Sequence, residues 1–213
     1  MAPTFLIGGG REDAQIRASH APFVAACGGG SIVAFALEDP ERWEGALRLA
    51  GATDVRCLSA PPTADDLGAA AGVFVGGGWT PGYQEALAGW RAPDLPYAGY
   101  SAGAAVASAR AIVGGWRLGE RAICAEEAGE DLDQLEVRDG LGLVPFAVDV
   151  HATQWGTLTR LVHAVGAGLV DEGWAIDEGT VLVVDGDAAR VEGLGGAYRV
   201  TRQDGRVAVS VQP

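Results

Sequence analysis

Lysine is absent from this 213-residue chain, so all fifteen basic residues are arginines. The absence excludes mechanisms that need a Schiff-base lysine or a P-loop lysine. Twenty-eight acidic residues leave a formal net charge of −13, and a phosphate backbone would therefore meet a repulsive field. Nucleic acid is not an expected partner.

Cysteine is scarce, and long hydrophobic runs are missing. Cys27, Cys57 and Cys124 are widely spaced and form no Cys-x-x-Cys pair that holds zinc or carries redox chemistry. We expect them to be buried, reduced thiols. No stretch approaches the roughly 18 to 20 apolar residues of a bilayer span, and residues 8–12 cut short the first apolar run, which makes a poor signal peptide. The expected location is the cytoplasm, without a membrane partner.

What the chain does contain is glycine and many short apolar runs. It has 33 glycines, and 48% of its residues are hydrophobic against 20% charged. This composition is typical of a folded globular protein and excludes a disordered chain. Because the length suits one large domain and no linker or repeat divides the sequence, we expect a single domain over residues 1–213.

Over the first hundred residues, short apolar runs alternate with amphipathic stretches, which is typical of βαβ units. The runs expected as strands are residues 4–7, 31–37, 55–58, 73–75 and 97–99. The stretches expected as helices between them are residues 12–26, 40–50, 64–71 and 81–90. Strands so short and continuously apolar suit the buried centre of a parallel sheet.

The second half of the chain has a different pattern. We expect helices over residues 101–108 and 156–165, and a solvated loop or hairpin, not a metal cluster, over the acidic residues 117–138. The tail has β-like runs at residues 180–184, 189–192, 197–201 and 207–211. Together these patterns predict an α/β fold with three layers and a doubly wound, mostly parallel sheet of the flavodoxin or Rossmann type. Antiparallel strands are added to it near the C-terminus.

The most informative segment is Gly99-Tyr100-Ser101-Ala102-Gly103. An apolar strand runs into Gly-x-Ser-x-Gly and then into an Ala-rich helix, which is the sequence form of a nucleophile elbow. Ser101 would then lie at a helix N-terminus that favours negative charge, with the Ala102 N–H as an oxyanion donor. A glycine-bracketed turn in which Ser101 only caps the helix gives the same pattern.

A second glycine-rich turn, Gly76-Gly77-Gly78, follows the strand predicted at residues 73–75. In a parallel sheet its loop opens on the same edge as Ser101, so the backbone N–H of Gly77 or Gly78 is a second oxyanion donor. The triplet lacks the Gly-x-Gly-x-x-Gly spacing and the ribose-binding acid that follows it, which disfavours dinucleotide binding.

A serine nucleophile needs a hydrogen-bonded base, typically a histidine that a carboxylate orients. His20 lies inside an expected helix, and His163 lies on an amphipathic helix where a structural or surface histidine is the ordinary situation. His151 instead ends the apolar run at residues 146–150, at a strand terminus of the kind where open α/β sheets build their sites. His151 is therefore the favoured base.

Asp177 and Glu178 are the candidates for the acid. Both lie where an apolar strand meets Gly179. Because side chains alternate along a strand, only one of the two can face the site. A solvated turn carboxylate with no part in catalysis fits the pattern equally well.

These motifs resemble those of the S51 serine peptidases, the family of dipeptidase E and cyanophycinase, in the class I glutamine-amidotransferase-like superfamily. The resemblance runs along nearly the whole chain. The segments that carry it are Ile-Gly-Gly-Gly at 7–10, Phe-Val-Gly-Gly-Gly-x-Thr at 74–80, Gly-Tyr-Ser-Ala-Gly-Ala at 99–104, Asp-Gly-Leu-Gly-Leu at 139–143, His151 followed by Arg160-Leu161, and Ile-Asp-Glu-Gly-Thr at 176–180.

The resemblance implies a Ser-His-Glu triad in which Ser101 is the nucleophile, His151 the general base and Glu178 the residue that orients it. No metal or organic cofactor is expected. The family's oxyanion donors correspond to backbone N–H groups of Gly77 or Gly78 and of Ala102.

The family's substrates carry an N-terminal or β-linked aspartyl group, so an arginine or polar cluster should receive that carboxylate. The residues expected to bind substrate are Trp79, Thr80, Gln154 and Arg160. Arg160 either binds a substrate carboxylate or ties down its own helix, and the sequence leaves both roles open. Trp79 and Ala152 replace residue types that relatives often carry, and both are expected to border the pocket.

The expected activity is that of a serine peptidase, a dipeptidase with Asp-X preference that acts through an acyl-enzyme. The expected partner is a small peptide substrate, and the sequence is also compatible with a homodimer. Alternatives on the same triad are a cyanophycinase-like enzyme, an esterase or an amidase. A catalytically silent binding protein on this scaffold is the alternative from another class.

Overall fold

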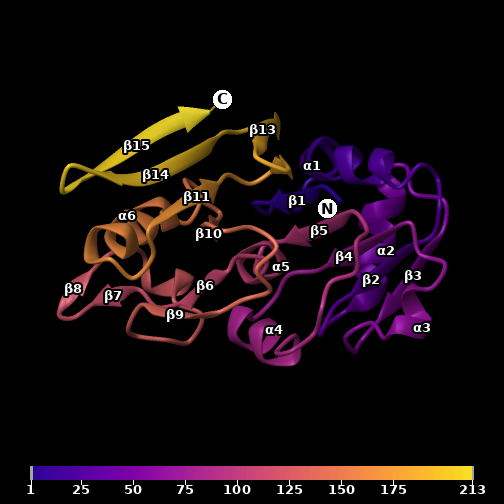
Figure 1. The fold of residues 1–213 in the computed structure, drawn as a ribbon, viewed down its shortest axis with the longest axis horizontal. Coiled ribbons are helices and arrows are strands. Elements are labelled where there is room, and N and C mark those ends of the chain that lie inside the picture. The colour runs from indigo at the N-terminus through magenta and orange to yellow at the C-terminus, as the bar shows by residue number, and fades with distance from the viewer. Residues whose placement is uncertain (1, 213) are drawn as a thin grey trace.

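The computed structural model describes residues 2–212, in which strands and helices alternate through the first half of the chain (Figure 1). The strands are β1 (Thr4–Ile7), β2 (Ile32–Phe35), β3 (Val55–Leu58), β4 (Gly72–Val75), β5 (Tyr97–Tyr100), β6 (Arg110–Gly114), β7 (Arg117–Leu118), β8 (Arg121–Ala122), β9 (Glu136–Asp139), β10 (Ala147–Val150), β11 (Glu172–Ile176), β12 (Thr180–Asp185), β13 (Ala188–Gly193), β14 (Ala197–Gln203) and β15 (Arg206–Gln212). The helices are α1 (Asp13–Ala26), α2 (Pro40–Leu49), α3 (Ala64–Leu67), α4 (Thr80–Ala86), α5 (Ala102–Val106) and α6 (Thr157–Ala167), with a 3₁₀ turn at Glu126–Ala128.

The central sheet has seven strands in the order β13-β12-β1-β5-β4-β2-β3. The five strands from β1 to β3 in this order are mutually parallel, whereas β12 pairs antiparallel with β1, and β13 antiparallel with β12. The predicted α/β fold with a mostly parallel sheet is confirmed.

The four strands predicted in the tail divide between two sheets. β12 and β13 extend the central sheet, but β14 and β15 join β10 and β11 in a second sheet of order β10-β11-β14-β15. The chain crosses between the sheets after Gly193, whose φ of 126° strongly favours glycine. A Cβ there would lie 2.3 Å from the Gly179 carbonyl oxygen.

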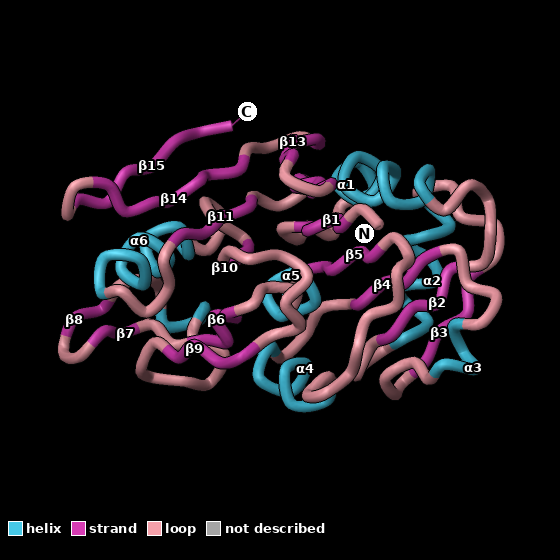
Figure 2. Tube along the Cα trace, in the orientation of Figure 1, coloured by secondary structure: helices cyan, strands magenta, loops and turns pink. Residues whose placement is uncertain are grey.

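Both faces of the central sheet are buried at β1, β2, β4 and β5, which explains why these strands are continuously apolar. Along β1, Phe5 and Ile7 pack with Phe23 of α1 and Leu47 of α2, whereas Leu6 belongs to the cluster on the other face. That second cluster includes residues of α4 and α5 and residues from β10 and β11. The second sheet is therefore held against the central sheet beside α5 (Figure 2).

Helix α6 covers the other face of the second sheet, where Leu161 and Ala164 pack with Ala175 and Val200. Between α5 and β10 the chain forms the antiparallel pair β6 and β9, which the sequence analysis did not predict, and the short hairpin β7-β8. The hairpin agrees with the loop or hairpin expected over residues 117–138. Three expected helices are shorter in the structure, where α3 ends at Leu67, α4 at Ala86 and α5 at Val106.

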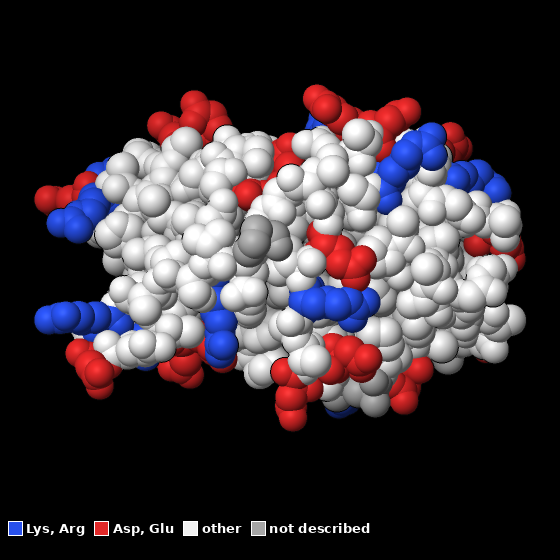
Figure 3. Space-filling view, turned by 90° about the horizontal axis from the view of Figure 1, so that it is seen from above, with Lys and Arg blue, Asp and Glu red and all other residues white. Residues whose placement is uncertain are grey.

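On the face shown in Figure 3, arginines are scattered as separate side chains among groups of acidic residues. All three cysteines are free, but only Cys27 is buried, so the expectation of buried thiols is wrong for Cys57 and Cys124, which are half-buried. Within residues 2–212, no helix has the length and apolar character needed to cross a membrane.

Candidate active site

Ser101 lies on the tight turn between β5 and α5. Its φ of 51° is left-handed, a conformation that costs a non-glycine residue on the order of 1–3 kcal/mol and concentrates at functional sites. The two flanking glycines have no room for a side chain, because a Cβ on Gly99 would lie 2.3 Å from the Gly103 carbonyl oxygen. A Cβ on Gly103 would lie 2.3 Å from the Val75 carbonyl oxygen. The sequence pattern thus has a steric cause at each glycine.

His151 immediately follows β10, also in a left-handed conformation with a φ of 56°. Its backbone N–H donates to the Gly8 carbonyl at 2.9 Å, and its Nε2 lies 2.9 Å from Ser101 Oγ. The imidazole fills the space above Gly9, where a Cβ would lie 2.2 Å from Cε1. The glycine-rich turn after β1 therefore makes room for this ring.

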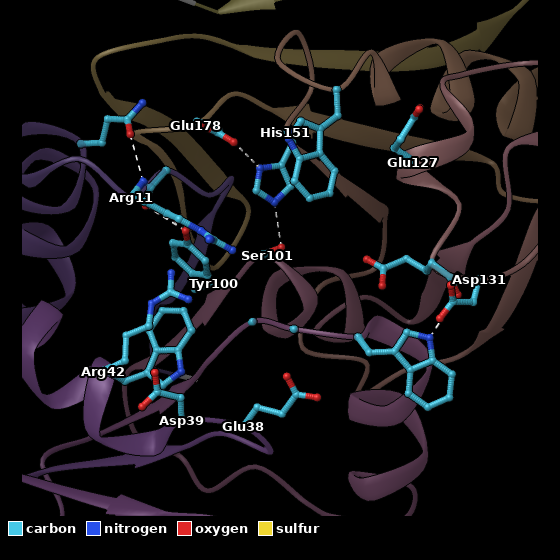
Figure 4. A pocket seen from close by; sticks show the side chains of 18 of the residues that line it. Arg11, Glu38, Asp39, Arg42, Tyr100, Ser101, Glu127, Asp131, His151 and Glu178 are labelled. Atoms are coloured by element: carbon cyan, nitrogen blue, oxygen red, sulfur yellow. Dashed lines mark hydrogen bonds and ion pairs between the residues drawn. The ribbon is translucent and has the colours of Figure 1, made fainter.

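Glu178 approaches the other side of the same imidazole. Its Oε1 lies 2.7 Å from His151 Nδ1, and its side chain is 22% exposed. Because an ionised carboxylate only accepts hydrogen bonds, Nδ1 carries the proton and Nε2 presents its lone pair to Ser101. Figure 4 shows this chain of contacts from Glu178 through His151 to Ser101.

Asp177 has a different set of partners. One carboxylate oxygen accepts hydrogen bonds from the Thr153 N–H and hydroxyl, and the other accepts from the Gly196 N–H and the Tyr198 hydroxyl. Asp177 is buried and links the turn after His151 to the turn before β14. The structure therefore brings Glu178, and not Asp177, to the imidazole.

The His151 ring also stacks on Trp155, with ring centroids 4.0 Å apart and an interplanar angle of 10°. Burial lowers the pKa of His151 below its usual value, against the opposing hydrogen bond and charge of Glu178. His151 is therefore neutral at neutral pH, as a general base must be. The sequence analysis missed Trp155.

The turn after β4 packs directly against the serine. A Cβ on Gly77 would lie 2.9 Å from Ser101 Cβ. Within the described chain, no partner is found for the backbone N–H groups of Gly77, Gly78 and Ala102. Ala102 begins α5, where unpaired N–H groups and the helix dipole favour an anion. Gly77 and Ala102 thus lie directly beside Ser101, and Gly78 follows Gly77 in the same turn. Their expected role as oxyanion donors stays a prediction.

A cavity of about 1200 Å³ opens over these residues. Ser101, His151 and Glu178 all line it, together with Gly77 and Gly78. Its remaining wall includes Trp79, Trp155, Arg11, Arg42 and carboxylates from residues 126–133. Arg11 and Arg42 carry no motif signal, and the sequence analysis missed both.

Trp79 lines the cavity as expected and is 45% exposed. Thr80 and Gln154 do not line it. Thr80 donates from its N–H and hydroxyl to the Glu130 carboxylate, and Gln154 accepts the Glu178 N–H at 3.0 Å. The polar groups of both residues are thus bonded within the protein, and their expected contact with substrate stays a prediction.

Of the two roles open to Arg160, the structure shows the structural one. Its side chain is 6% exposed, and Nε and Nη2 donate to the two carboxylate oxygens of Asp149 at 2.9 and 2.7 Å. A third nitrogen donates to the Ala128 carbonyl. A buried guanidinium needs such a paired carboxylate, so the expectation that Arg160 binds substrate is wrong.

The other two histidines lie away from Ser101. His20 is fully buried in α1, where its Nδ1 contacts the Ser19 hydroxyl and its ring lies on Phe74. His163 lies on α6. Among residues 2–212, no three His, Cys, Asp or Glu side chains are grouped so that they could hold a metal ion.

No protein-family model matches the sequence, and no curated protein matches it. Among solved structures, the crystal structure of a peptidase from an acI-B1 actinobacterium is similar, with a TM-score of 0.63 and 16% sequence identity. The match covers 100% of this chain and 95% of that chain. The protein thus has the α/β fold of a known peptidase over its whole length.

Proposed function

We propose that this protein is a serine-type peptidase that hydrolyses small peptides, a dipeptidase of the S51 type. The observation that carries the proposal is the pair of hydrogen bonds that joins Glu178, His151 and Ser101 at 2.7 and 2.9 Å. A strained serine, a neutral imidazole and an orienting carboxylate in one cavity are the parts that activated serine nucleophiles need. The fold shared with a peptidase supports the same class.

In the first half-reaction, Ser101 Oγ attacks the carbonyl carbon of the scissile peptide bond while His151 Nε2 takes the hydroxyl proton. The oxyanion forms beside the N–H groups of Gly77, Gly78 and Ala102, which have no partner in the described chain. The C–N bond then breaks, and the imidazolium returns its proton to the leaving amine. An acyl-enzyme on Ser101 remains.

In the second half-reaction, water replaces the leaving amine. His151 takes one proton from the water as its oxygen attacks the acyl carbon, and the bond to Ser101 Oγ breaks. The proton returns to Ser101, so the enzyme is regenerated and the peptide has gained one water molecule. Glu178 stabilises the imidazolium in both halves and keeps its proton on Nδ1.

Hydrolysis of a dipeptide panel with Asp, Glu, Gly or Ala at the N-terminus tests this proposal. We expect the wild-type protein to cleave members of the panel, with Asp-X preferred as the S51 resemblance implies. Ser101→Ala should lower kcat by at least ~1000-fold because the nucleophile is lost, with an unchanged circular dichroism spectrum. Unchanged turnover in that variant would contradict the mechanism.

A further inference from the structure

The charges around the catalytic cavity are unevenly distributed. Arg11, in the turn after β1, and Arg42, on α2, lie on one side of Ser101 together with Tyr100, and Glu127 and Asp131 lie on the other side (Figure 4). Among the lining residues, both arginines therefore lie on one side, which also carries the carboxylates of Glu38, Asp39 and Glu178, whereas the opposite side carries carboxylates alone. An anionic group of a ligand is bound on the arginine side by direct contact with the guanidinium groups, and not by the overall field of the cavity.

The two arginines are available to a ligand. Both are exposed, and within residues 2–212 neither forms an ion pair. Glu38 and Asp39 also line the cavity near Arg42 without an ion pair to it. Arg160, by contrast, is buried, and its guanidinium group is already paired with the Asp149 carboxylate.

Tyr100 lies beside the two arginines in the wall of the catalytic cavity. Its hydroxyl donates to the Gly10 carbonyl at 2.8 Å. Burial raises the pKa of Tyr100 to about 12, and the positive charges of Arg42 and Arg11 pull that pKa in the opposite direction. Figure 4 shows Tyr100, one residue before Ser101, beside both arginines, and all three residues line both this cavity and a second one.

A second cavity, of about 560 Å³, continues beyond the arginines. The two cavities share Arg11, Arg42, Trp43 and Tyr100, so the arginines lie where they meet. The far wall of the second cavity is mainly apolar and includes Ile16, Ala46 and Leu49. A ligand that fits this arrangement has a carboxylate at the two arginines and an apolar group that enters the second cavity.

We propose that Arg11 and Arg42 bind the α-carboxylate of the substrate's C-terminal residue, and that the second cavity takes the apolar side chain of this leaving residue. The inference rests on the proposed dipeptidase function. An aspartyl side chain ends in its carboxylate and would leave the second cavity unfilled. The carboxylates of Glu127 and Asp131 then face the part of the cavity that is left for the substrate's N-terminal ammonium.

Binding to the Ser101→Ala protein tests the inference without turnover, by calorimetric titration of Ala-Leu, Ala-Leu amide and Ala-Ser. Ala-Leu should bind at least about tenfold more tightly than either comparison peptide, since one loses the charged hydrogen bonds and the other the apolar contact. Added to Ser101→Ala, Arg11→Gln or Arg42→Gln should abolish the preference for the free carboxylate. Arg190→Gln, an exposed arginine outside both cavities, should keep it.

Equal binding of Ala-Leu and its amide would overturn the inference. Loss of Asp-Leu amide binding in Arg11→Gln and Arg42→Gln, to the same extent as loss of Ala-Leu binding, would also overturn it, because the arginines would then bind an aspartyl side chain. Covalent labelling of Ser101 in the wild-type protein separates the two proposals. If Ser101 is labelled but the protein shows no preference for a free carboxylate, only the role of Arg11 and Arg42 is refuted. If the preference is present but Ser101 is not labelled, only the serine-peptidase function is refuted.

Discussion

Replacement of Glu178 by glutamine removes one charge from the catalytic cavity and almost no volume. In the wild-type protein the carboxylate accepts the Nδ1 proton of His151 at 2.7 Å. A glutamine amide at this position can donate its N–H to Nδ1 instead, which moves the imidazole proton to Nε2. The nitrogen that faces Ser101 would then have no lone pair to accept the serine proton.

The expected loss in kcat is about 1000- to 10,000-fold, or about 4–5.5 kcal/mol of transition-state stabilisation. The short contact and the burial of His151 favour the upper end of this range, and the 22% exposure of the Glu178 side chain favours the lower end. The assay is the steady-state rate on the best dipeptide of the panel. KM should change much less than kcat, because Glu178 acts through His151 and does not contact the substrate.

Asp177→Asn is the matched control, one residue away. Asp177 accepts four hydrogen bonds from Thr153, Gly196 and Tyr198, so this change should lower the free energy of unfolding by about 1–3 kcal/mol. The fraction of the Asp177→Asn protein that is folded should have a kcat within about tenfold of the wild-type value. The reasoning is refuted if Glu178→Gln keeps kcat within tenfold of wild type, or if Asp177→Asn loses more activity than Glu178→Gln.

Two further predictions concern pH. Because burial lowers the pKa of His151 and only the neutral imidazole accepts the serine proton, kcat/KM should fall with acid around a midpoint below 6.5; a midpoint above 6.5 would contradict this. Burial also lowers the pKa of His20 from 6.5 to about 4, so between these values the unfolded chain binds a proton that the folded chain does not. Acidification from pH 6.5 to 4 should therefore cost about 3 kcal/mol of stability through His20. In urea unfolding, the free energy of unfolding of His20→Gln should fall less between pH 6.5 and 4 than that of the wild-type protein. The same pH dependence in both proteins would contradict a lowered pKa of His20.

Local sequence signals were sufficient for the serine and the histidine. The turn at Ser101 needs flanking glycines for steric reasons, and this requirement is visible in the sequence. His151 follows an apolar run that becomes β10, which places it at a strand end. Because both signals depend on neighbours along the chain, a single sequence contains them.

Contacts between distant segments could not be predicted in the same way. Whether Asp177 or Glu178 meets the imidazole depends on Gly196 and Tyr198, which follow much later in the chain and bind Asp177. Arg160 is occupied by Asp149 because α6 packs on β10, a contact that no local pattern encodes. The division of the tail between two sheets has the same cause, since period-two patterns show strands but not their partners.

Arg11 and Arg42 illustrate the same limit. Both belong to segments whose patterns predict only a turn and a helix, and their common cavity arises when α2 packs beside the turn after β1. An arginine was expected to meet an anionic substrate in the cleft, and this stays a prediction, although Arg11 and Arg42 do line the cavity. Which arginine does so depends on the packing of the helices, and the sequence pattern does not specify that packing.

Covalent labelling of Ser101 tests the central claim most directly. The wild-type protein is incubated with a fluorophosphonate, digested and analysed by mass spectrometry, with Ser101→Ala and Ser108→Ala as matched variants. The account predicts one adduct, on the peptide that contains Ser101, which is lost in Ser101→Ala and kept in Ser108→Ala. A folded wild-type protein without an adduct on Ser101 would contradict the account.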